Sequence, residues 1–202
     1  MQDIRYQNTK LMPSKVVCVG RNYVEHIKEL NNETPDMMVL FNKPNSAITS
    51  ELRYIQEDCR FEGEICFLIK DKVIEGIGFG LDLTKAGIQN KMKKNGLPWE
   101  RAKGFDGSAV LSRFVSFRGD IQTIEMKLFR NGSLAQHATY DLMIYKPEKI
   151  LSEIQTFMTL EDGDVIMSGT PKGVSIYERN DVFLAVIYVE GKIVLKEEFI
   201  AQ

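Results

Sequence analysis

Apolar and polar positions alternate most clearly in two segments near the middle of the chain. Residues 61–69 read FEGEICFLI. Side chains of a strand alternate between two faces, so Glu62 and Glu64 share one face with apolar residues further along. Because apolar residues occur on both faces, the segment is predicted to be an interior strand of a sheet. Two carboxylates on a covered strand are unfavourable unless a positive charge pairs with them.

The second segment, residues 76–84, reads GIGFGLDLT. Alternation places Asp82 on one face with Gly78 and Gly80, so we expect room for a ligand beside this carboxylate. A Glu-x-Glu pair on a strand is more often a solvated face, and Asp82 could instead cap the following helix. Three carboxylates on two core strands favour a site for a hard divalent cation such as Mg²⁺ or Mn²⁺.

The rest of the pattern predicts a strand-dominated α+β domain. Strands are expected at residues 16–19, 37–41, 110–117, 121–130, 165–167, 181–190 and 193–199, with helices at 22–30, 85–94 and from Pro147 onward. Asn131-Gly132 predicts a hairpin turn. Residues 1–14 are expected to be an irregular lead-in. Because no linker or repeat divides the chain, residues 1–202 are predicted to form a single catalytic domain.

Composition excludes several classes of protein. The 202 residues carry a net charge of −2, which gives no electrostatic footprint for nucleic acid. No apolar run approaches the roughly 20 residues that span a bilayer, and the N-terminus lacks an apolar signal core. The three cysteines are odd in number and are interpreted as reduced, mostly buried thiols. We therefore expect a cytoplasmic protein without a membrane partner.

Four residues outside the two strands are candidates for chemistry. His26 and Glu29 lie three apart on a predicted helix, where the carboxylate can orient the imidazole as a general base. Such pairs also occur on ordinary exposed helices, and His137 is interpreted as a surface residue. Lys43 and Lys103 lie next to Pro or Gly and could bind a carboxylate or an enolate, although either alone could be a surface lysine.

The loop SGTPKGV, residues 168–174, resembles a phosphate-binding loop only superficially. Its spacing differs from the G-x-x-x-x-G-K-[ST] motif, so a nucleotide site is rejected. The loop's backbone N–H groups could still bind an anion, and Thr170 would add a hydroxyl.

In combination and in order, these segments resemble the fumarylacetoacetate hydrolase superfamily, particularly its compact acylpyruvase/oxaloacetate decarboxylase branch. The matching segments extend from about Val16 to Val174: VVCVGRNYVEHIKEL, FNKP, EGEICFLI, GFGLDLT, IQNKMKKNGLPWERAKGFD and LEDGDVIMSGTPKGV. The resemblance implies a mixed β-roll or barrel-like fold of the superfamily's C-terminal type. It also implies a homodimer.

The resemblance further implies roles for single residues. Glu62, Glu64 and Asp82 match the ligands of Mg²⁺ or Mn²⁺. His26 and Glu29 match a dyad on a lid helix that orients a water molecule. Lys103 matches a catalytic position that meets developing negative charge. Positions that line the substrate site are matched by Arg21, Lys43, Gln89 and Thr170.

The function implied is Mg²⁺-dependent hydrolysis of a carbon–carbon bond in acylpyruvate-type β-diketo acids, through a metal-bound enolate of a small 2-oxo acid. Oxaloacetate decarboxylation reaches the same enolate and is the close alternative. An isomerase/decarboxylase of hydroxyheptadienedioate-type catabolites is a third. A non-catalytic metal-binding protein is disfavoured, because such a protein would not need the His26–Glu29 pair.

Overall fold

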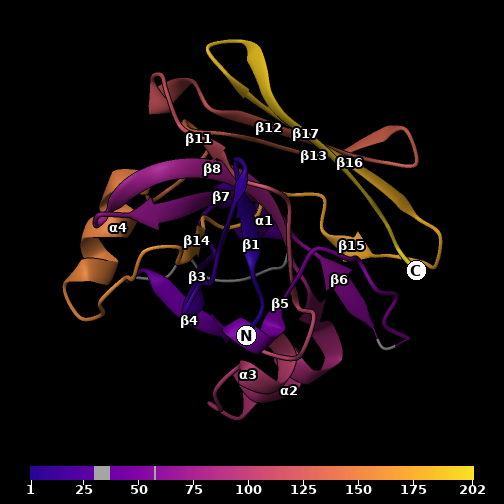
Figure 1. Cartoon of the computed structure of the whole chain (residues 1–202). Coiled ribbons are helices and arrows are strands. Elements are labelled where there is room, and N and C mark those ends of the chain that lie inside the picture. The colour runs from indigo at the N-terminus through magenta and orange to yellow at the C-terminus, as the bar shows by residue number, and fades with distance from the viewer. Residues whose placement is uncertain (30–36, 57) are drawn as a thin grey trace.

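The computed structural model describes residues 1–29, 37–56 and 58–202, and it is dominated by strands (Figure 1). The main sheet follows the order β4 (Val39–Pro44), β3 (Lys15–Gly20), β14 (Val165–Met167), β7 (Gly63–Lys70), β8 (Val73–Asp82), β10 (Ala109–Leu111) and β5 (Ile48–Thr49). A further strand, β11 (Val115–Ser116), pairs with β8. The sheet is mixed, because β3–β14 and β5–β10 are parallel pairs. It curls into a nearly closed, barrel-like shape, which confirms the predicted fold class.

A second, antiparallel sheet lies across the main sheet at the top of Figure 1. Its order is β13 (Ser133–Thr139), β12 (Glu125–Arg130), β16 (Val182–Val189) and β17 (Lys192–Ile200). The turn between β12 and β13 is the predicted Asn-Gly hairpin, with positive φ at Asn131 and Gly132. A small third sheet contains β15 (Ser175–Ile176), β6 (Cys59–Phe61) and β9 (Thr84–Lys85).

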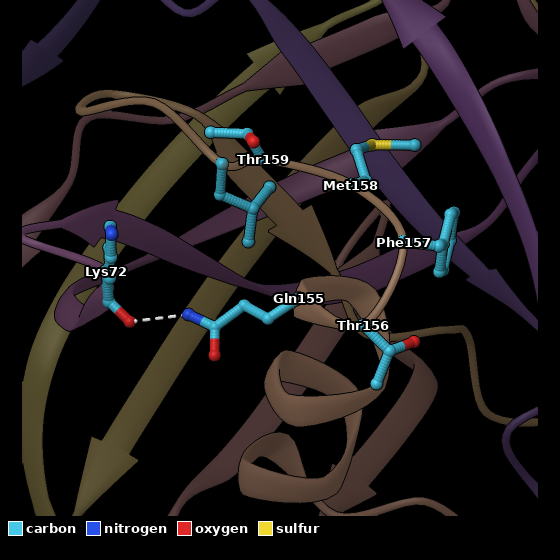
Figure 2. Close-up of a pocket in the computed structure, with 7 residues that line it drawn as sticks. Lys72, Gln155, Thr156, Phe157, Met158 and Thr159 are labelled. Carbon is cyan, nitrogen blue, oxygen red and sulfur yellow. Dashed lines mark hydrogen bonds between the residues drawn. The ribbon is translucent and has the colours of Figure 1, made fainter.

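The described residues also contain four α-helices, α1 (Val24–Glu29), α2 (Ala86–Lys94), α3 (Glu100–Lys103) and α4 (Pro147–Gln155), and two 3-10 helices, Asn45–Ala47 and Ile121–Thr123. The helix predicted at residues 22–30 begins two residues later, at Val24. Residue 30, the last of the predicted helix, lies outside the described residues. Helices α2 and α3 lie together at the bottom of Figure 1. The side chain of Gln155 ties the end of α4 to the β7–β8 turn by donating to Lys72 O at 2.8 Å (Figure 2). None of the helices in the described residues is long and apolar enough to cross a membrane.

Strand β7 is buried on both faces, as its pattern predicts. Ile65 and Phe67 belong to the larger core cluster, which also contains residues of the second sheet such as Phe183. Cys66 and Leu68 face the opposite way, into a smaller core inside the curl of the main sheet. All three cysteines are buried free thiols, which confirms their interpretation.

The glycines of β8 serve the core and do not leave room for a ligand. A Cβ atom on Gly78 would lie 2.8 Å from the ring of Phe114, and one on Gly80 would lie 2.8 Å from Cys66 Sγ. Side chains from neighbouring strands therefore occupy the space that the sequence suggested was free. The expectation of ligand space beside these two glycines is wrong.

The first fourteen residues are not irregular, contrary to expectation. Strands β1 (Ile4–Tyr6) and β2 (Thr9–Leu11) form an antiparallel hairpin that turns at Gln7, where φ is 51°. Ile4 and Tyr6 are buried, and the Tyr6 hydroxyl donates to Glu75 Oε1 at 2.7 Å. Two buried residues are too short a pattern to predict a strand from sequence. The hairpin is stabilised by its contact with β8, which lies far along the chain.

Candidate metal centre and active site

The three carboxylates predicted to bind a metal meet at one end of the main sheet. Glu62 lies between β6 and β7, Glu64 belongs to β7, and Asp82 ends β8. The antiparallel pairing of β7 with β8 sets Glu64 opposite Gly80 and so brings it near Asp82. One oxygen from each carboxylate lies within 4.8 Å of the others. All three residues are at most 9% exposed, so the predicted clustering on covered strands is found.

Two buried lysines balance part of this negative charge. Lys103, at the end of α3, places Nζ 2.9 Å from Glu62 Oε2, 2.6 Å from Asp82 Oδ2 and 2.5 Å from Thr84 Oγ1. Lys43 reaches Asp82 from the other side, with Nζ 2.8 Å from Oδ1, and it also donates to the backbone carbonyls of Leu83 and Lys103. Asp82 therefore lies between two ammonium groups.

The charges within the cluster shift its pKa values in opposite directions. Burial raises the pKa of Glu64 well above its usual value, and the negative charges of Asp82 and Glu62 raise it further. Burial also acts to raise the pKa of Glu62, but the Lys103 ammonium outweighs it and lowers that pKa. Burial opposes the charge of Lys103, yet Asp82 and Glu62 hold its pKa above the ordinary lysine value. Lys103 is therefore a cation at neutral pH.

This donor set fits a hard divalent cation. It offers carboxylate oxygens alone, which Mg²⁺ and Mn²⁺ prefer. Glu64 has no lysine partner among the described residues, and its Oε2 accepts only the Gly169 N–H, at 2.7 Å. Burial and two neighbouring carboxylates raise the pKa of Glu64, and no lysine of the described residues pairs with it. A divalent cation would supply a positive charge on this side.

Helix α1 brings the predicted His26–Glu29 pair to the same place. His26 Nδ1 lies 3.3 Å from Glu29 Oε2, and His26 is only 6% exposed. Glu29 also accepts the backbone N–H of Gly173, at 3.1 Å to Oε1, which fastens α1 to the loop of residues 168–174. His26 also lines the same cavity as Glu62. The imidazole therefore lies at the rim of the carboxylate cluster.

The cluster opens into a cavity of about 30 Å³, roughly the volume of one water molecule. Eight of the ten predicted site residues line it: Arg21, His26, Glu62, Glu64, Asp82, Gln89, Lys103 and Thr170. Glu29 acts through His26 and does not line the cavity. Lys43, predicted to contact substrate, is fully buried behind Asp82. The lining also includes three side chains that sequence analysis did not select: Phe41, Lys93 and Trp99.

Sequence analysis also missed Gln136, a buried residue of β13. Its Oε1 accepts the N–H of Gly63 at 2.8 Å, and its Nε2 donates to Thr170 Oγ1 at 2.8 Å and to Pro171 O at 2.9 Å. Thr170 in turn donates to Gly63 O at 3.0 Å. Gln136 thus joins the loop of residues 168–174 to the start of β7, between Glu62 and Glu64. The one sequence signal for its burial is that Gln136 lies two residues before Ala138 on the same hairpin strand, so both side chains share one face.

A much larger hollow, of about 520 Å³, lies elsewhere, between the end of α4 and the β7–β8 turn (Figure 2). Of the described residues that line it, only Lys72 carries a charge. It brings together no group able to bind a metal ion or transfer a proton. The small acidic cavity, and not the larger hollow, is therefore the candidate active site.

Comparison with known proteins identifies the class that this fold and site define. The fumarylacetoacetate (FAA) hydrolase C-terminal family matches residues 15–190, and the chain belongs to this family. Among curated proteins, it is 40% identical over 187 residues to the oxaloacetate tautomerase YcgM of Escherichia coli, an alignment covering 83% of this chain and 85% of that protein. The resemblance inferred from the motifs is confirmed.

Solved structures agree with this assignment. A candidate fumarylacetoacetate isomerase/hydrolase from Oleispira antarctica superposes with a TM-score of 0.93 at 32% identity, covering all of both chains. Fumarylpyruvate hydrolase from Pseudomonas aeruginosa, solved with Mn²⁺ and pyruvate, superposes with a TM-score of 0.86 at 25% identity. That comparison covers 100% of this chain and 96% of the other.

Proposed function

We propose that this protein is a divalent-metal-dependent enzyme that interconverts the keto and enol forms of oxaloacetate. The observation that carries the proposal is the buried carboxylate cluster, with a protonated Lys103 against it and His26 at its rim. The curated relative named oxaloacetate tautomerase supports oxaloacetate as the substrate. Tautomerisation was not among the expected activities. The expected oxaloacetate alternative has more support than the acylpyruvate hydrolysis that led the sequence-based expectations.

Glu62, Glu64 and Asp82 would hold Mg²⁺ or Mn²⁺. Bound there, the ion would supply a Lewis acid that withdraws electron density from the 2-oxo group of the substrate. The chain itself has to bind and orient the substrate and move one proton.

The proton transfer is assigned to His26. With Nδ1 donating to Glu29, Nε2 of His26 is free to take a proton from C3 of the keto form. The electron pair of the broken C–H bond becomes the C2–C3 double bond, and the 2-oxo oxygen becomes the enolate oxygen. The Lys103 ammonium stabilises this charge, and a proton returned to the oxygen completes the enol. No water is consumed and no group leaves.

Hydrolysis of an acylpyruvate is the second candidate. The fumarylpyruvate hydrolase solved with Mn²⁺ and pyruvate favours it, since that protein shares this fold. Water would then attack the distal carbonyl, and the same enolate would leave as pyruvate. Oxaloacetate decarboxylation reaches the enolate by loss of CO₂. Isomerase activity on dienedioates and a non-catalytic metal-binding role stay predictions. The homodimeric state also stays a prediction.

The test separates the three reactions of one purified protein. Freshly dissolved enol-oxaloacetate is followed by loss of the enol's ultraviolet absorbance, with Mg²⁺ or with EDTA, against a buffer blank for spontaneous tautomerisation. Pyruvate release from oxaloacetate and from acetylpyruvate is measured in parallel with lactate dehydrogenase. We expect metal-dependent loss of enol without matching pyruvate release.

A pair of histidine variants makes the test specific. His26→Gln should lower the rate about 10²–10⁴-fold, the range for loss of a general base. His137→Gln changes the other histidine of the chain, an exposed residue, and should retain activity. Metal-dependent pyruvate release from acetylpyruvate, with no acceleration of enol loss, would overturn the proposal in favour of the hydrolase.

A further inference from the structure

Helix α2 places a further basic side chain, that of Lys93, in the wall of the active-site cavity. Lys93 follows Gln89 by four residues, so both side chains lie on the same face of the helix, and both line the cavity. Arg21, at the end of β3, lines the same cavity and has a positive φ of 58°. Trp99 lies between α2 and α3 and completes this side of the wall.

Lys93 differs from the other two lysines of the site in its partners. Lys43 and Lys103 each contact a carboxylate at 2.9 Å or less. No carboxylate of the described residues lies within ion-pair distance of Lys93. Its ammonium instead lies 5.3 Å from the centre of the Trp99 ring, a weaker cation–π contact.

The surroundings of Lys93 favour the arrival of an anion. Burial lowers the pKa of its ammonium, and the positive charge of Arg21 lowers it further. Both effects reflect a partly buried cation without enough negative charge around it. A carboxylate placed beside Lys93 would offset both, and it would be bound by charge-assisted hydrogen bonds.

The charge balance at the other end of the cavity points the same way. The three carboxylates outnumber Lys43 and Lys103 by one formal negative charge. A divalent cation would convert this to one formal positive charge, which matches the single carboxylate of a 2-oxo acid. A substrate with a second carboxylate needs a second counter-charge away from the cluster. Lys93 lines the cavity, and no carboxylate of the described residues pairs with it.

We propose that Lys93 binds the carboxylate distal to the 2-oxo acid group and so selects 2-oxo dicarboxylates over 2-oxo monocarboxylates. The inference rests on the proposed function, because it assumes that the 2-oxo acid end of the substrate faces the carboxylate cluster. Binding at both ends would hold the carbon between them near His26. Lys93 is thus a specificity-determining residue of the site.

Trp99 provides a direct test, because it is the single tryptophan of the chain and lies against Lys93. Its fluorescence is titrated in the presence of Mg²⁺ with oxaloacetate and with pyruvate, which is oxaloacetate without the distal carboxylate. Free N-acetyltryptophanamide corrects for absorption by the ligands. Three variants are compared with wild type: Lys93→Met, Lys93→Arg and, as a matched control, Lys94→Met. Lys94 is the next residue of α2 and is exposed, so its variant makes the same charge change outside the cavity.

We expect Lys93→Met to weaken oxaloacetate binding about 10- to 100-fold, the loss of one charge-assisted interaction of about 1.5–3 kcal/mol. Pyruvate binding should change less than about twofold, Lys93→Arg should restore most of the preference, and Lys94→Met should resemble wild type. If Lys93→Met weakened the binding of both ligands equally, or weakened the binding of neither, the proposed subsite would be wrong. A wild type that binds oxaloacetate through Lys93 but does not tautomerise it would overturn the proposed reaction and leave the subsite standing.

Discussion

Gln136 Nε2 donates to Thr170 Oγ1 at 2.8 Å, and this bond joins the second sheet to the active site. Through its Oε1, the same side chain accepts the N–H of Gly63, the residue between two carboxylates of the cluster. Gln136 contacts neither the cavity nor the carboxylates themselves. It is therefore a positioning residue that sets where Thr170 and the start of β7 lie.

Replacing Gln136 with leucine should therefore affect stability and substrate binding together. The change leaves the buried N–H of Gly63 and the buried carbonyl of Pro171 without this partner, at about 1–3 kcal/mol each. We expect the free energy of unfolding in urea to fall by about 2–4 kcal/mol. KM should rise several-fold more than kcat falls, because Thr170 is displaced while His26 and Lys103 remain.

Gln122→Leu is the matched control for this prediction, since it makes the same change at an exposed glutamine. It should alter the free energy of unfolding by less than about 0.5 kcal/mol. A Gln136→Leu variant with wild-type KM would show that Thr170 does not depend on this bond for its position.

The comparison of sequence and structure shows what a local pattern can reveal. Alternation along two strands favoured a shared site for Glu62, Glu64 and Asp82, and the pairing of β7 with β8 brings these carboxylates together. The same alternation misled at Gly78, since it reports the face of a residue and not what fills the space beside it. Phe114, which fills that space, comes from 36 residues further along the chain.

Residues that act across distant segments were beyond the reach of pattern analysis. Lys93 follows a helical pattern like any solvated lysine, and only the fold brings it into the lining of the same cavity as Arg21. Lys43 was selected from its place beside Pro44 as a residue that lines the substrate site, whereas the structure buries it. Its depth behind Asp82 depends on how β4 and β8 meet in three dimensions. Motif resemblance supplied much of what pattern analysis could not, because a family motif records the packed arrangement.

Glu64 provides a test of the metal site that does not require activity. Its pKa is raised by burial and by Asp82 and Glu62, so the folded protein without metal disfavours its ionised form. The resulting loss of stability begins as pH rises above the unfolded-state pKa, near 4.3, and is complete above the raised folded-state pKa. Glu64→Gln removes this loss. In EDTA, the Tm of the variant relative to wild type should therefore rise with pH across that range.

Magnesium should stabilise wild type more than it stabilises Glu64→Gln. At about 100 times its Kd the ion stabilises wild type by about 2.7 kcal/mol, whereas Glu64→Gln should bind it at least about 10-fold more weakly. Thermal unfolding with and without Mg²⁺ measures both effects, and Glu198→Gln, at an exposed position, should behave as wild type. An unchanged Mg²⁺ shift in Glu64→Gln would contradict the assignment of this ligand.

The last prediction concerns Asp164, which holds the parallel pair β3–β14 beside the carboxylate strand. Its side chain is fully buried and accepts the N–H of Ser14 at 2.7 Å and that of Glu161 at 2.9 Å. Lys15 Nζ lies 2.6 Å from its Oδ2. Burial alone would raise the pKa of Asp164, but the hydrogen bonds from Lys15, Glu161 and Ser14 outweigh it and hold that pKa below its usual value. The ionised carboxylate therefore stabilises the folded state.

Since the folded-state pKa is depressed, this stabilisation is fully present above the unfolded-state pKa, near 3.9, and is lost as pH falls through the folded-state value. Asp164→Asn should lower the free energy of unfolding at pH 7 by about 1.5–3 kcal/mol, the range for hydrogen bonds to a charged group. The difference from wild type should shrink as the pH of urea unfolding is lowered below 4. Asp162→Asn, in the same turn but exposed, should change stability by less than about 0.5 kcal/mol. A pH-independent difference between wild type and Asp164→Asn would mean that the shape of this side chain, and not its charge, holds β3 against β14.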